Sequence, residues 1–274
     1  MTGAVDGLGA LDGVSLGELD ASVALRERVE RKYVVEPAVV GGLVAALQAR
    51  LGTGLRVLDV EGRRAFEYRS LYYDTTDLLS YRLSVHGHRR RFKVRSRLYV
   101  DSGTSVLEVK VKDGRGLTQK HRLARAGAAW DAPLEPGVIE WIDALVGCRA
   151  VPTPLDLRPV IVTAYTRRTL VEGAGARVTI DSGLACGPVG ADLGALREVI
   201  VVETKSSGPS GGWGTSTVTD RELWRRGVRP VRISKFGVAM ALCTPALPAN
   251  RWNRVLRHHL GWNPARGPSV AAPG

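Results

Sequence analysis

The sequence is 274 residues long, with 44% apolar and 24% charged residues and a formal net charge of +12. This balance is that of a folded globular protein and argues against a disordered chain. The positive excess predicts an anionic partner. No apolar run approaches the roughly 20 residues that a membrane-spanning helix needs, so we expect no transmembrane segment.

The cysteine content and the N-terminal sequence indicate the cellular compartment of the protein. The three cysteines, Cys148, Cys186 and Cys243, are widely spaced and odd in number. This pattern argues against a disulfide framework or a zinc site and for a reducing compartment. The N-terminus also lacks the basic segment of a signal peptide. Together these features predict a cytoplasmic protein.

The first part of the chain predicts a leader, a strand, a helix and a second strand. Residues 1–24 are glycine-rich, acidic and without periodicity, so we expect a flexible leader. Residues 25–35 predict the first strand. Residues 37–51 predict a helix, because Pro37 suits a first helical turn and the apolar residues recur on one stripe. Residues 66–73 predict the next strand, which ends in a turn-forming sequence.

The middle and end of the chain predict hairpins and further helices. We expect strands at 89–100 and 105–112, a return strand at 118–123 after an Asp-Gly turn, and a helix at 136–148. The later expected elements are a hairpin at 160–171 and 176–180, a strand at 199–205, a Gly/Ser-rich loop at 206–217, a helix at 220–226 and a helix at 235–242 with Ser234 as its N-cap.

Charged residues recur two apart in six short segments, with apolar residues between them. Because a strand points residues i and i+2 to the same face, each segment predicts a strand with one charged and one apolar face. Six such strands predict an α+β fold with a closed β-barrel, whose apolar face lies outward under helices and whose cationic face lines the lumen. The segments are Glu30-x-Lys32, Lys93-x-Arg95-x-Arg97, Glu108-x-Lys110-x-Lys112, Lys120-x-Arg122, Arg177-x-Thr179-x-Asp181 and Glu203-x-Lys205.

A cationic lumen of this kind suits a chain of phosphates. Arg offers paired hydrogen bonds to phosphate oxygens, and Lys offers a compact charge. Glutamates interleaved with the cations either neutralise a neighbour or hold a divalent metal that bridges phosphates. Ser234 and Lys235 stand at a predicted helix N-terminus, where free backbone N–H groups favour phosphate.

The C-terminal segment, residues 244–274, predicts a basic helix and a disordered tail outside the domain at 25–243. Within 251–260, Trp252 and the apolar residues fall on one helical face and the arginines largely on the other. Such a helix either makes a peripheral contact with a membrane surface or polyanion, or docks on the barrel through its own Trp.

Several motifs resemble the triphosphate tunnel metalloenzyme (CYTH-like) superfamily. The later motifs resemble its VTC domain, the catalytic domain of the vacuolar transporter chaperone polyphosphate polymerases and their bacterial relatives. The resemblance covers about residues 25–243 and keeps the order of the motifs. They are Glu30-Arg31-Lys32-Tyr33, Ser70-Leu71-Tyr72-Tyr73-Asp74-Thr75, Lys93-Val94-Arg95-Ser96-Arg97-Leu98-Tyr99, Leu107-Glu108-Val109-Lys110, Tyr165-Thr166-Arg167-Arg168, Arg177-Val178-Thr179-Ile180-Asp181, Glu203-Thr204-Lys205 and Ser234-Lys235-Phe236.

The resemblance implies an eight-stranded antiparallel β-barrel tunnel with a cationic lumen and flanking helices. It also implies a polyphosphate polymerase that transfers the γ-phosphate of ATP to inorganic polyphosphate with a divalent metal, Mn²⁺ or Mg²⁺. By matching position it implies three groups of site residues. Catalytic contacts with phosphate are implied for Lys32, Arg95, Arg97, Arg167, Arg177 and Lys235. Substrate binding is implied for Lys93, Lys110, Lys120, Arg122, Tyr165, Lys205, Arg232 and Ser234. Metal ligation is implied for Glu203, with Glu30 and Glu108 as further candidates.

Some features depart from this pattern or leave alternatives open. Arg232 stands where the family often has Lys, and Arg28-x-Glu30-x-Lys32 replaces the first carboxylate of the Glu-x-Glu-x-Lys that opens the hydrolase branch. Three functions stay open: a polymerase, a triphosphate or polyphosphate hydrolase in the same tunnel, and a non-catalytic polyphosphate or nucleic-acid binder. No recognition-helix motif is present, so we expect no specific nucleic-acid partner. His86-x-His88 adjoins arginines that disfavour a bound metal.

Overall fold

The computed structural model describes residues 3–21, 28–115, 117–126, 130–147, 153–173, 175–196, 198–207 and 216–263. The chain forms two compact units. Unit 1 comprises Met1–Phe66, Thr166–Leu184 and Arg197–Arg232, and unit 2 comprises Glu67–Tyr165, Ala185–Leu196 and Ile233–Gly274. The sequence predicts one continuous domain over 25–243. Two long strands, β8 (Leu157–Glu172) and β9 (Ala176–Gly187), each pass from one unit to the other.

Unit 1 combines strands with helices from several parts of the chain. Its helices are η1 (Gly3–Ala10), α1 (Leu16–Ala21), α2 (Pro37–Leu51), η2 (Gly52–Gly54) and α5 (Val218–Arg225). Its strands are β1 (Asp12–Val14), β2 (Arg28–Val35), β3 (Leu55–Leu58), β11 (Ile200–Ser207) and the adjoining parts of β8 (Leu157–Glu172) and β9 (Ala176–Gly187).

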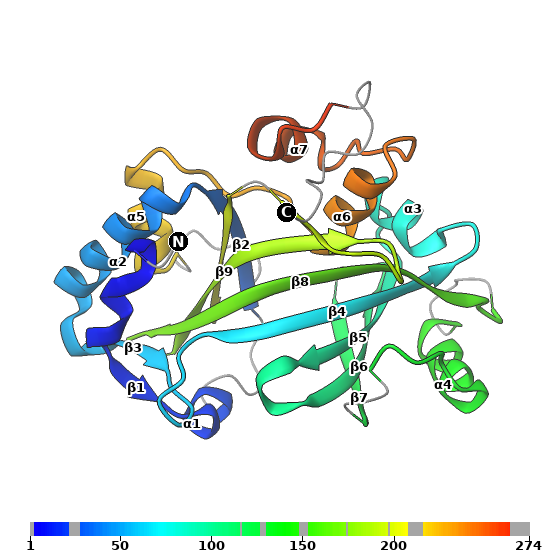
Figure 1. Ribbon diagram of the computed structural model, residues 1–274, viewed down its shortest axis with the longest axis horizontal. Helices are drawn as coiled ribbons and strands as arrows, with labels where there is room; N and C mark the ends of the chain where they lie inside the picture. Colours follow the sequence, from blue (N-terminus) through cyan, green and yellow to red (C-terminus); the bar gives the residue numbers. More distant parts are fainter. Residues whose placement is uncertain are drawn as a thin grey trace. The chain divides into compact units, whose positions relative to one another are not determined.

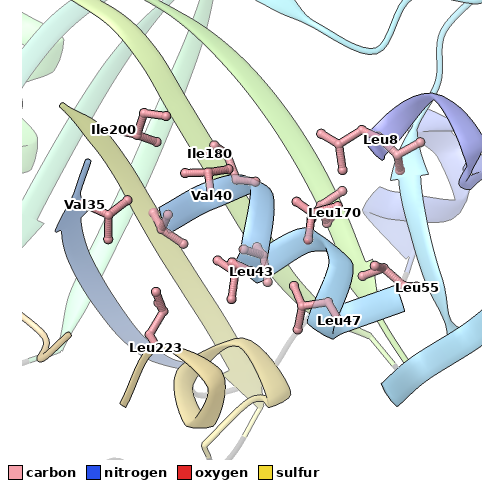
Figure 2. Close-up of a cluster of buried hydrophobic side chains, with 14 of the residues drawn as sticks. Leu8, Val35, Val40, Leu43, Leu47, Leu55, Leu170, Ile180, Ile200 and Leu223 are labelled. Atoms are coloured by element: carbon pink, nitrogen blue, oxygen red, sulfur yellow. The ribbon is translucent and has the colours of Figure 1, made fainter. Parts of the chain in front are cut away.

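The core of unit 1 lies between α2 and the apolar face of the strands. Val40, Leu43 and Leu47 share one stripe of α2 and are fully buried. They pack into a cluster that includes Ile180 of β9 and Leu223 of α5 (Figure 2). The strands place their charged residues on the opposite face, as the alternation predicts.

The N-terminal segment differs from the flexible leader that the sequence predicts. Leu8, Leu11, Val14 and Leu19 are buried in unit 1. Nη1 of Arg64 donates to three carbonyl oxygens of this segment, those of Leu8 at 3.0 Å, Gly9 at 2.9 Å and Leu11 at 2.9 Å. These contacts join residues more than 50 positions apart, so no local pattern could predict them.

Unit 2 contains the two predicted hairpins of residues 89–123 and the remaining described helices. Its strands are β4 (Phe66–Thr75), β5 (Arg91–Tyr99), β6 (Thr104–Lys112), β7 (Thr118–Arg125), β10 (Gly194–Ala195) and the adjoining parts of β8 and β9. Its helices are α3 (Leu79–Val85), η3 (Val100–Ser102), α4 (Pro136–Gly147), α6 (Lys235–Cys243) and α7 (Asn253–Leu260). Figure 1 shows β5, β6 and β7 as successive neighbours.

The core of unit 2 lies under α4. Phe92 and Val94 of β5 and Val109 of β6 are buried, and they cluster with Ile142 and Val146 of α4. Lys93 and Arg95 alternate with these apolar residues along β5, so they lie on the opposite face of the sheet. The predicted arrangement, apolar face under a helix and charged face away from it, is therefore present in unit 2 as in unit 1.

The main strand path contains eight strands, and its paired registers are antiparallel, as the sequence predicts. In unit 1 the order is β2-β11-β9-β8, and in unit 2 it continues from β8 through β4, β5 and β6 to β7. Within the described part of the chain no pairing joins β2 to β7, so the sheet is open where the sequence predicts a closed barrel. The free edge of β2 is partly occupied, because Val231 donates its N–H to the carbonyl of Lys32 at 2.7 Å.

The C-terminal helix α7 is docked on unit 2 by its apolar face. Trp252, Val255 and Leu256 are buried, while Arg254 and Arg257 are exposed. The ring of Trp252 lies directly against Gly237 of α6, where a Cβ atom would overlap it. Of the two alternatives that the sequence leaves open for this segment, the contacts match docking through its own Trp. The predicted tail after residue 263 lies outside the described residues, and none of the described helices has both the length and the apolarity to cross a bilayer.

Candidate phosphate-binding site

The charged face of unit 1 centres on Glu203. In the ladder of β2 and β11, Glu203 pairs with Lys32, and Lys205 pairs with Glu30. The carboxylate of Glu203 contacts the ammonium of Lys205, and its Oε2 lies 3.8 Å from Nζ of Lys32. Lys32 also contacts Glu30, so this lysine joins both predicted metal-binding carboxylates of the unit.

The electrostatics of this cluster keep Glu203 ionised. Burial favours the neutral acid, but the nearby charges of Lys205 and Lys32 outweigh it and hold the pKa of Glu203 well below its usual range. Burial likewise opposes the charge on Lys32, yet attraction to Glu203 and Glu30 raises the pKa of Lys32 overall. A carboxylate in this setting is a permanent anion available to a metal or to a cation.

Arg167 and Arg177 lie on neighbouring strands of unit 1. Arg177 pairs across the ladder with Lys205, and Thr179 pairs with Glu203. Arg167 is held by Asp181, with Nε 2.6 Å from Oδ1 and Nη2 2.8 Å from Oδ2. Such a two-point contact fixes the plane of the guanidinium. Six predicted cations or carboxylates of unit 1 therefore belong to one set of paired strands, and Asp181 orients one of them.

The charged face of unit 2 contains a second buried carboxylate, Glu108. Its Oε2 accepts from Nε of Arg95 at 2.6 Å, and its Oε1 contacts Lys120 and lies 3.4 Å from Nε of Arg122. Burial raises the pKa of Glu108, but the charges of Arg95, Arg97 and Lys120 hold it far below its usual range. Both oxygens of Glu108 are in close contact with cations, whereas Oε2 of Glu203 has Lys32 only at 3.8 Å, which favours an ion-pairing role for Glu108 over the predicted metal ligation.

Arg97 lies beside an aromatic pair. Its Nη2 donates to the hydroxyl of Tyr165 at 3.0 Å, and its guanidinium lies 5.2 Å from the ring centre of Tyr68. Tyr68 and Tyr165 are stacked with ring centres 5.3 Å apart. Arg97 is only 7% exposed, and within the described residues its Nε has no hydrogen-bond partner. A buried guanidinium with an unsatisfied N–H is costly unless an anion reaches it.

A buried hydroxyl lies beside Arg97 on the same face of the sheet. Ser70 of β4 pairs directly with Arg97 in the ladder of β4 and β5, so both side chains lie on one face. The Oγ of Ser70 is buried and has no partner in the described part of the chain. Ser70 therefore presents a second unsatisfied polar group beside Arg97.

Ser234 caps helix α6 as predicted. Its Oγ accepts from the N–H of Gly237 at 3.2 Å and from Nζ of Lys93 at 2.7 Å. The next residue, Lys235, places its Nζ 4.4 Å from the ring centre of Tyr165. The helix start thus brings Lys93, Ser234, Lys235 and Tyr165 together within unit 2.

The remaining predicted residues lie at the borders of these clusters. Lys110 is exposed on β6 and pairs with Lys93 across the ladder. Arg232 is exposed in the segment before α6. The rings of His86 and His88 are 6.4 Å apart, and no group of three or more His, Cys, Asp or Glu side chains among the described residues is arranged to hold a metal.

Sequence reasoning missed four residues that shape these clusters. Tyr68 and Ser70 lie beside Arg97, and Asp181 orients Arg167. The hydroxyl of Tyr72 accepts a hydrogen bond from Nη1 of Arg95, whose guanidinium also lies over the Tyr72 ring. A usable signal existed for three of them, because Tyr68, Ser70 and Tyr72 alternate along one strand and share its face. The sequence pattern instead favours core roles for the residues around Tyr72.

The fold and the paired cations define a class of protein. An antiparallel α+β sheet carries helices on its apolar face and ion-paired Arg, Lys and Glu on the other, which is the arrangement expected of an anion-binding protein. The family model described as the VTC domain matches residues 27–244. The chain therefore belongs to the VTC domain family.

Solved structures resemble the chain at low sequence identity. A protein from Hippeastrum, assigned as an adenylyl cyclase and described as having a dominant triphosphatase activity, is 14% identical with a TM-score of 0.47, and the match covers 78% of this chain and 96% of that one. The PH1012 protein from Pyrococcus horikoshii OT3 is 13% identical with a TM-score of 0.38, over 74% and 92%. A conserved hypothetical protein from Pyrococcus furiosus is 10% identical with a TM-score of 0.37, over 77% and 99%. No curated protein matches the sequence.

Proposed function

We propose that the protein is a metal-dependent polyphosphate polymerase, which transfers the γ-phosphate of ATP to the end of an inorganic polyphosphate chain. The observation that carries the proposal is Arg97, a buried guanidinium beside Tyr165 with an unpartnered Nε. A phosphate oxygen is the acceptor that such a group lacks. Membership of the VTC domain family supports the same substrate class.

The proposal assigns phosphate contacts to the cations of each unit. In both units the cations are already arranged around a buried carboxylate, Glu203 in unit 1 and Glu108 in unit 2. This lowers the cost of holding like charges close together before substrate arrives. The proposed phosphate-contacting residues are Lys32, Arg167, Arg177, Lys205 and Arg232 in unit 1, and Lys93, Arg95, Arg97, Lys110, Lys120, Arg122, Tyr165, Ser234 and Lys235 in unit 2.

A divalent metal fits the carboxylates of unit 1. Mg²⁺ is usually bound by one or two protein carboxylates together with substrate phosphates, and Glu203 and Glu30 supply two carboxylates that share Lys32. We therefore assign metal ligation to Glu203 with Glu30 as its partner. When bound, Mn²⁺ or Mg²⁺ would neutralise the charge that develops on the phosphates during transfer. Lys32 and Lys205 would then be released to contact phosphate oxygens.

The rest of the catalytic advantage would come from positioning. Phosphoryl transfer asks for little covalent chemistry from the protein, and it depends on aligning the attacking and leaving oxygens. Arg167, fixed in its plane by Asp181, and Arg95, fixed by Glu108, are pre-oriented for such contacts. The replacement of the first carboxylate of Glu-x-Glu-x-Lys by Arg28 favours transfer to a phosphate end over hydrolysis.

One experiment distinguishes the three functions. The purified protein is incubated with γ-labelled ATP and Mn²⁺, and labelled polymer is resolved from free phosphate on a gel. A polymerase yields a ladder of labelled polymer, whereas a hydrolase yields only free phosphate. Protein that binds polyphosphate but consumes no ATP with either Mn²⁺ or Mg²⁺ would be a binder, and that result would overturn the proposal.

A further inference from the structure

The row of cations on β5 and β6 continues beyond the residues to which phosphate contacts are assigned. Lys93 pairs with Lys110, and the next outward pair on the same face is Arg91 with Lys112. Alternate residues on paired strands share a face, and they recur about every 6.8 Å along it. The charged face of unit 2 therefore extends by one further pair of cations.

A third cation joins this pair from another part of the chain. Arg251, which precedes α7, packs its guanidinium against Gly87, in the turn between α3 and β5. A Cβ atom at Gly87 would lie 2.5 Å from Nη1 of Arg251, and the backbone there has a φ of 74°. Glycine thus serves both the left-handed turn and the close approach of the guanidinium.

The three cations repel one another. Burial lowers the pKa of Arg91, and the charge of Arg251 lowers it further. Burial also lowers the pKa of Lys112, and the charges of Arg91 and Arg251 add to that effect. The charge of Asp113 offsets part of this repulsion at Lys112, and its Oδ1 also accepts from the N–H groups of Arg115 and Leu117, each at 2.9 Å.

We propose that Arg91, Lys112 and Arg251 form a further polyphosphate subsite, which holds phosphates of a chain beyond those at Lys93 and Lys110. The inference rests on the proposed function, because it extends the same row of cations. The expected consequence is a preference for long chains. A triphosphate bound at the cations inward of Arg91 and Lys112 would be too short to gain from the further subsite. The three side chains carry charge without a ring on which a base could stack, which favours polyphosphate over single-stranded nucleic acid.

The test compares two ligands on matched variants. Affinities for tripolyphosphate and for long-chain polyphosphate are measured by titration calorimetry for the wild type, Lys112→Gln and Arg251→Gln. The control is Arg254→Gln with Arg257→Gln, which removes two exposed arginines of α7 outside the cluster. We expect each subsite variant to lose about tenfold in affinity for the long chain, because a charged hydrogen bond is lost, and to keep its affinity for tripolyphosphate. Thermal unfolding confirms that each variant is folded.

The outcomes separate this inference from the proposed function. Subsite variants that bind long chains as the wild type does, or a control that loses as much affinity, would overturn the subsite while leaving the polymerase intact. Wild-type protein that binds neither phosphate ligand would instead overturn the proposed function. Single-stranded RNA that competes at equal charge concentration, with the same dependence on Arg251, would identify a nucleic-acid site and contradict the proposal.

The thiols of Cys186 and Cys243 carry a second inference from a different observation. Cys186 lies near the end of β9 and is buried, Cys243 is the last residue of α6, and their sulfur atoms are 3.8 Å apart. A disulfide requires the sulfurs to approach to about 2.05 Å. We infer that this pair forms a reversible disulfide under oxidising conditions. With hydrogen peroxide, one thiol becomes a sulfenic acid with loss of water, and the second thiol displaces a second water to form the S–S bond.

Thiol counting tests the pair in a Cys148→Ser background. Peroxide should remove both remaining free thiols together, a linked peptide should appear in mass spectrometry, and dithiothreitol should restore both thiols. Cys186→Ser in the same background is the matched control, and it should give no intramolecular link. Stepwise oxidation of Cys243 to sulfinic acid in the pair-containing protein, without any linked peptide, would contradict the inference.

Discussion

Lys32 on β2 lies directly opposite Glu203 on β11, and its ammonium nitrogen is 3.8 Å from Oε2 of that carboxylate. The same lysine contacts Glu30 two positions before it on β2. One cation thus links the two carboxylates that we assign to the metal. A divalent ion held by Glu203 and Glu30 would compete with Lys32 for these carboxylates, which would leave the lysine to contact phosphate.

Replacing Glu203 tests this assignment. Glu203→Gln keeps the size of the side chain and removes its charge, so we expect metal-dependent turnover to fall by about a hundredfold or more while the protein stays folded. Glu30→Gln is the comparator, because the Glu30 side chain is 38% exposed against 10% for Glu203, and its loss should be smaller. Turnover with Mn²⁺ and circular dichroism are the measurements. Undiminished activity of Glu203→Gln contradicts the ligand role.

Replacing Glu108 should destabilise the fold. Glu108→Gln leaves Arg95, Lys120 and Arg122 without their shared carboxylate, which should cost about 3 kcal/mol in the free energy of unfolding at pH 7. The folded-state pKa of Glu108 is depressed, so its stabilisation is present above its unfolded pKa and is lost as pH falls below it. The difference from wild type should therefore shrink in acid.

Urea unfolding at pH 7 and at acid pH measures this effect. The exposed Glu67 of β4 supplies the control, and Glu67→Gln should change the free energy of unfolding by less than about 0.5 kcal/mol. Tripolyphosphate should restore more stability to Glu108→Gln than to wild type, because phosphate can replace the missing anion. A Glu108→Gln protein as stable as the wild type at pH 7 would show that the ion pairs contribute nothing.

Lys120 predicts a pH dependence of anion binding. The pKa of Lys120 is lowered to about 7, chiefly by burial. Attraction to Glu108 raises this pKa, and repulsion from Arg95 and Arg122 lowers it further. Lys120 is charged below that pH and neutral above it, so its contribution to tripolyphosphate affinity should fade as pH rises through about 7. Lys120→Arg stays charged throughout. The ratio of the two affinities should change by about two- to fivefold between pH 6 and 8, and parallel profiles would contradict the titration.

Ser70 allows stability and binding to be separated. Its hydroxyl is buried without a partner in the described part of the chain, so Ser70→Ala should leave the free energy of unfolding unchanged or raise it. If the hydroxyl meets phosphate beside Arg97, the same variant should bind tripolyphosphate about tenfold more weakly. Chemical denaturation and calorimetry on one preparation measure both. Equal affinity in the two proteins would remove Ser70 from the site.

Two glycines in helices should respond in opposite directions to alanine. In α2 nothing lies within 4 Å of a Cβ added at Gly42, so Gly42→Ala should stabilise the protein by about 0.5 to 1 kcal/mol through helix propensity. In α6 a Cβ at Gly237 would overlap the ring of Trp252, so Gly237→Ala should destabilise it by about 1 to 3 kcal/mol. Denaturant midpoints test both, and a stabilised Gly237→Ala protein would contradict the docking of α7.

The sequence predicts the parts of this molecule that depend on local periodicity. The alternation of Lys93 and Arg95 with Phe92 and Val94 predicts both the strand and the face of each residue, because the pleat fixes them. The apolar stripe of α2 and the cap at Ser234 are predicted for the same kind of reason. The cations of the candidate site therefore follow from the sequence alone.

The features that the sequence misses depend on distant partners. Helix α3 follows a residue, Leu78, with a φ of 56°, and its first N–H groups are satisfied by Asp74, which accepts from Ser80 and Tyr81 at 2.8 Å each. The pattern at 74–77 predicts only a turn. The packing of the N-terminal segment through Arg64, and the pairing of Ser70 with Arg97, are likewise set by chain folding rather than by neighbouring residues.

Strand β7 ends the main strand path and is paired through its backbone with β6. A strand at the edge of a sheet is a template for a strand of another molecule, and natural edges are protected by charged side chains. Lys120 and Arg122 supply that protection here, and they are also residues that we assign to phosphate. On the proposed function, resistance to aggregation and recognition of the substrate would depend on the same two side chains, so neutralising them to weaken binding would also remove a barrier to edge-to-edge association.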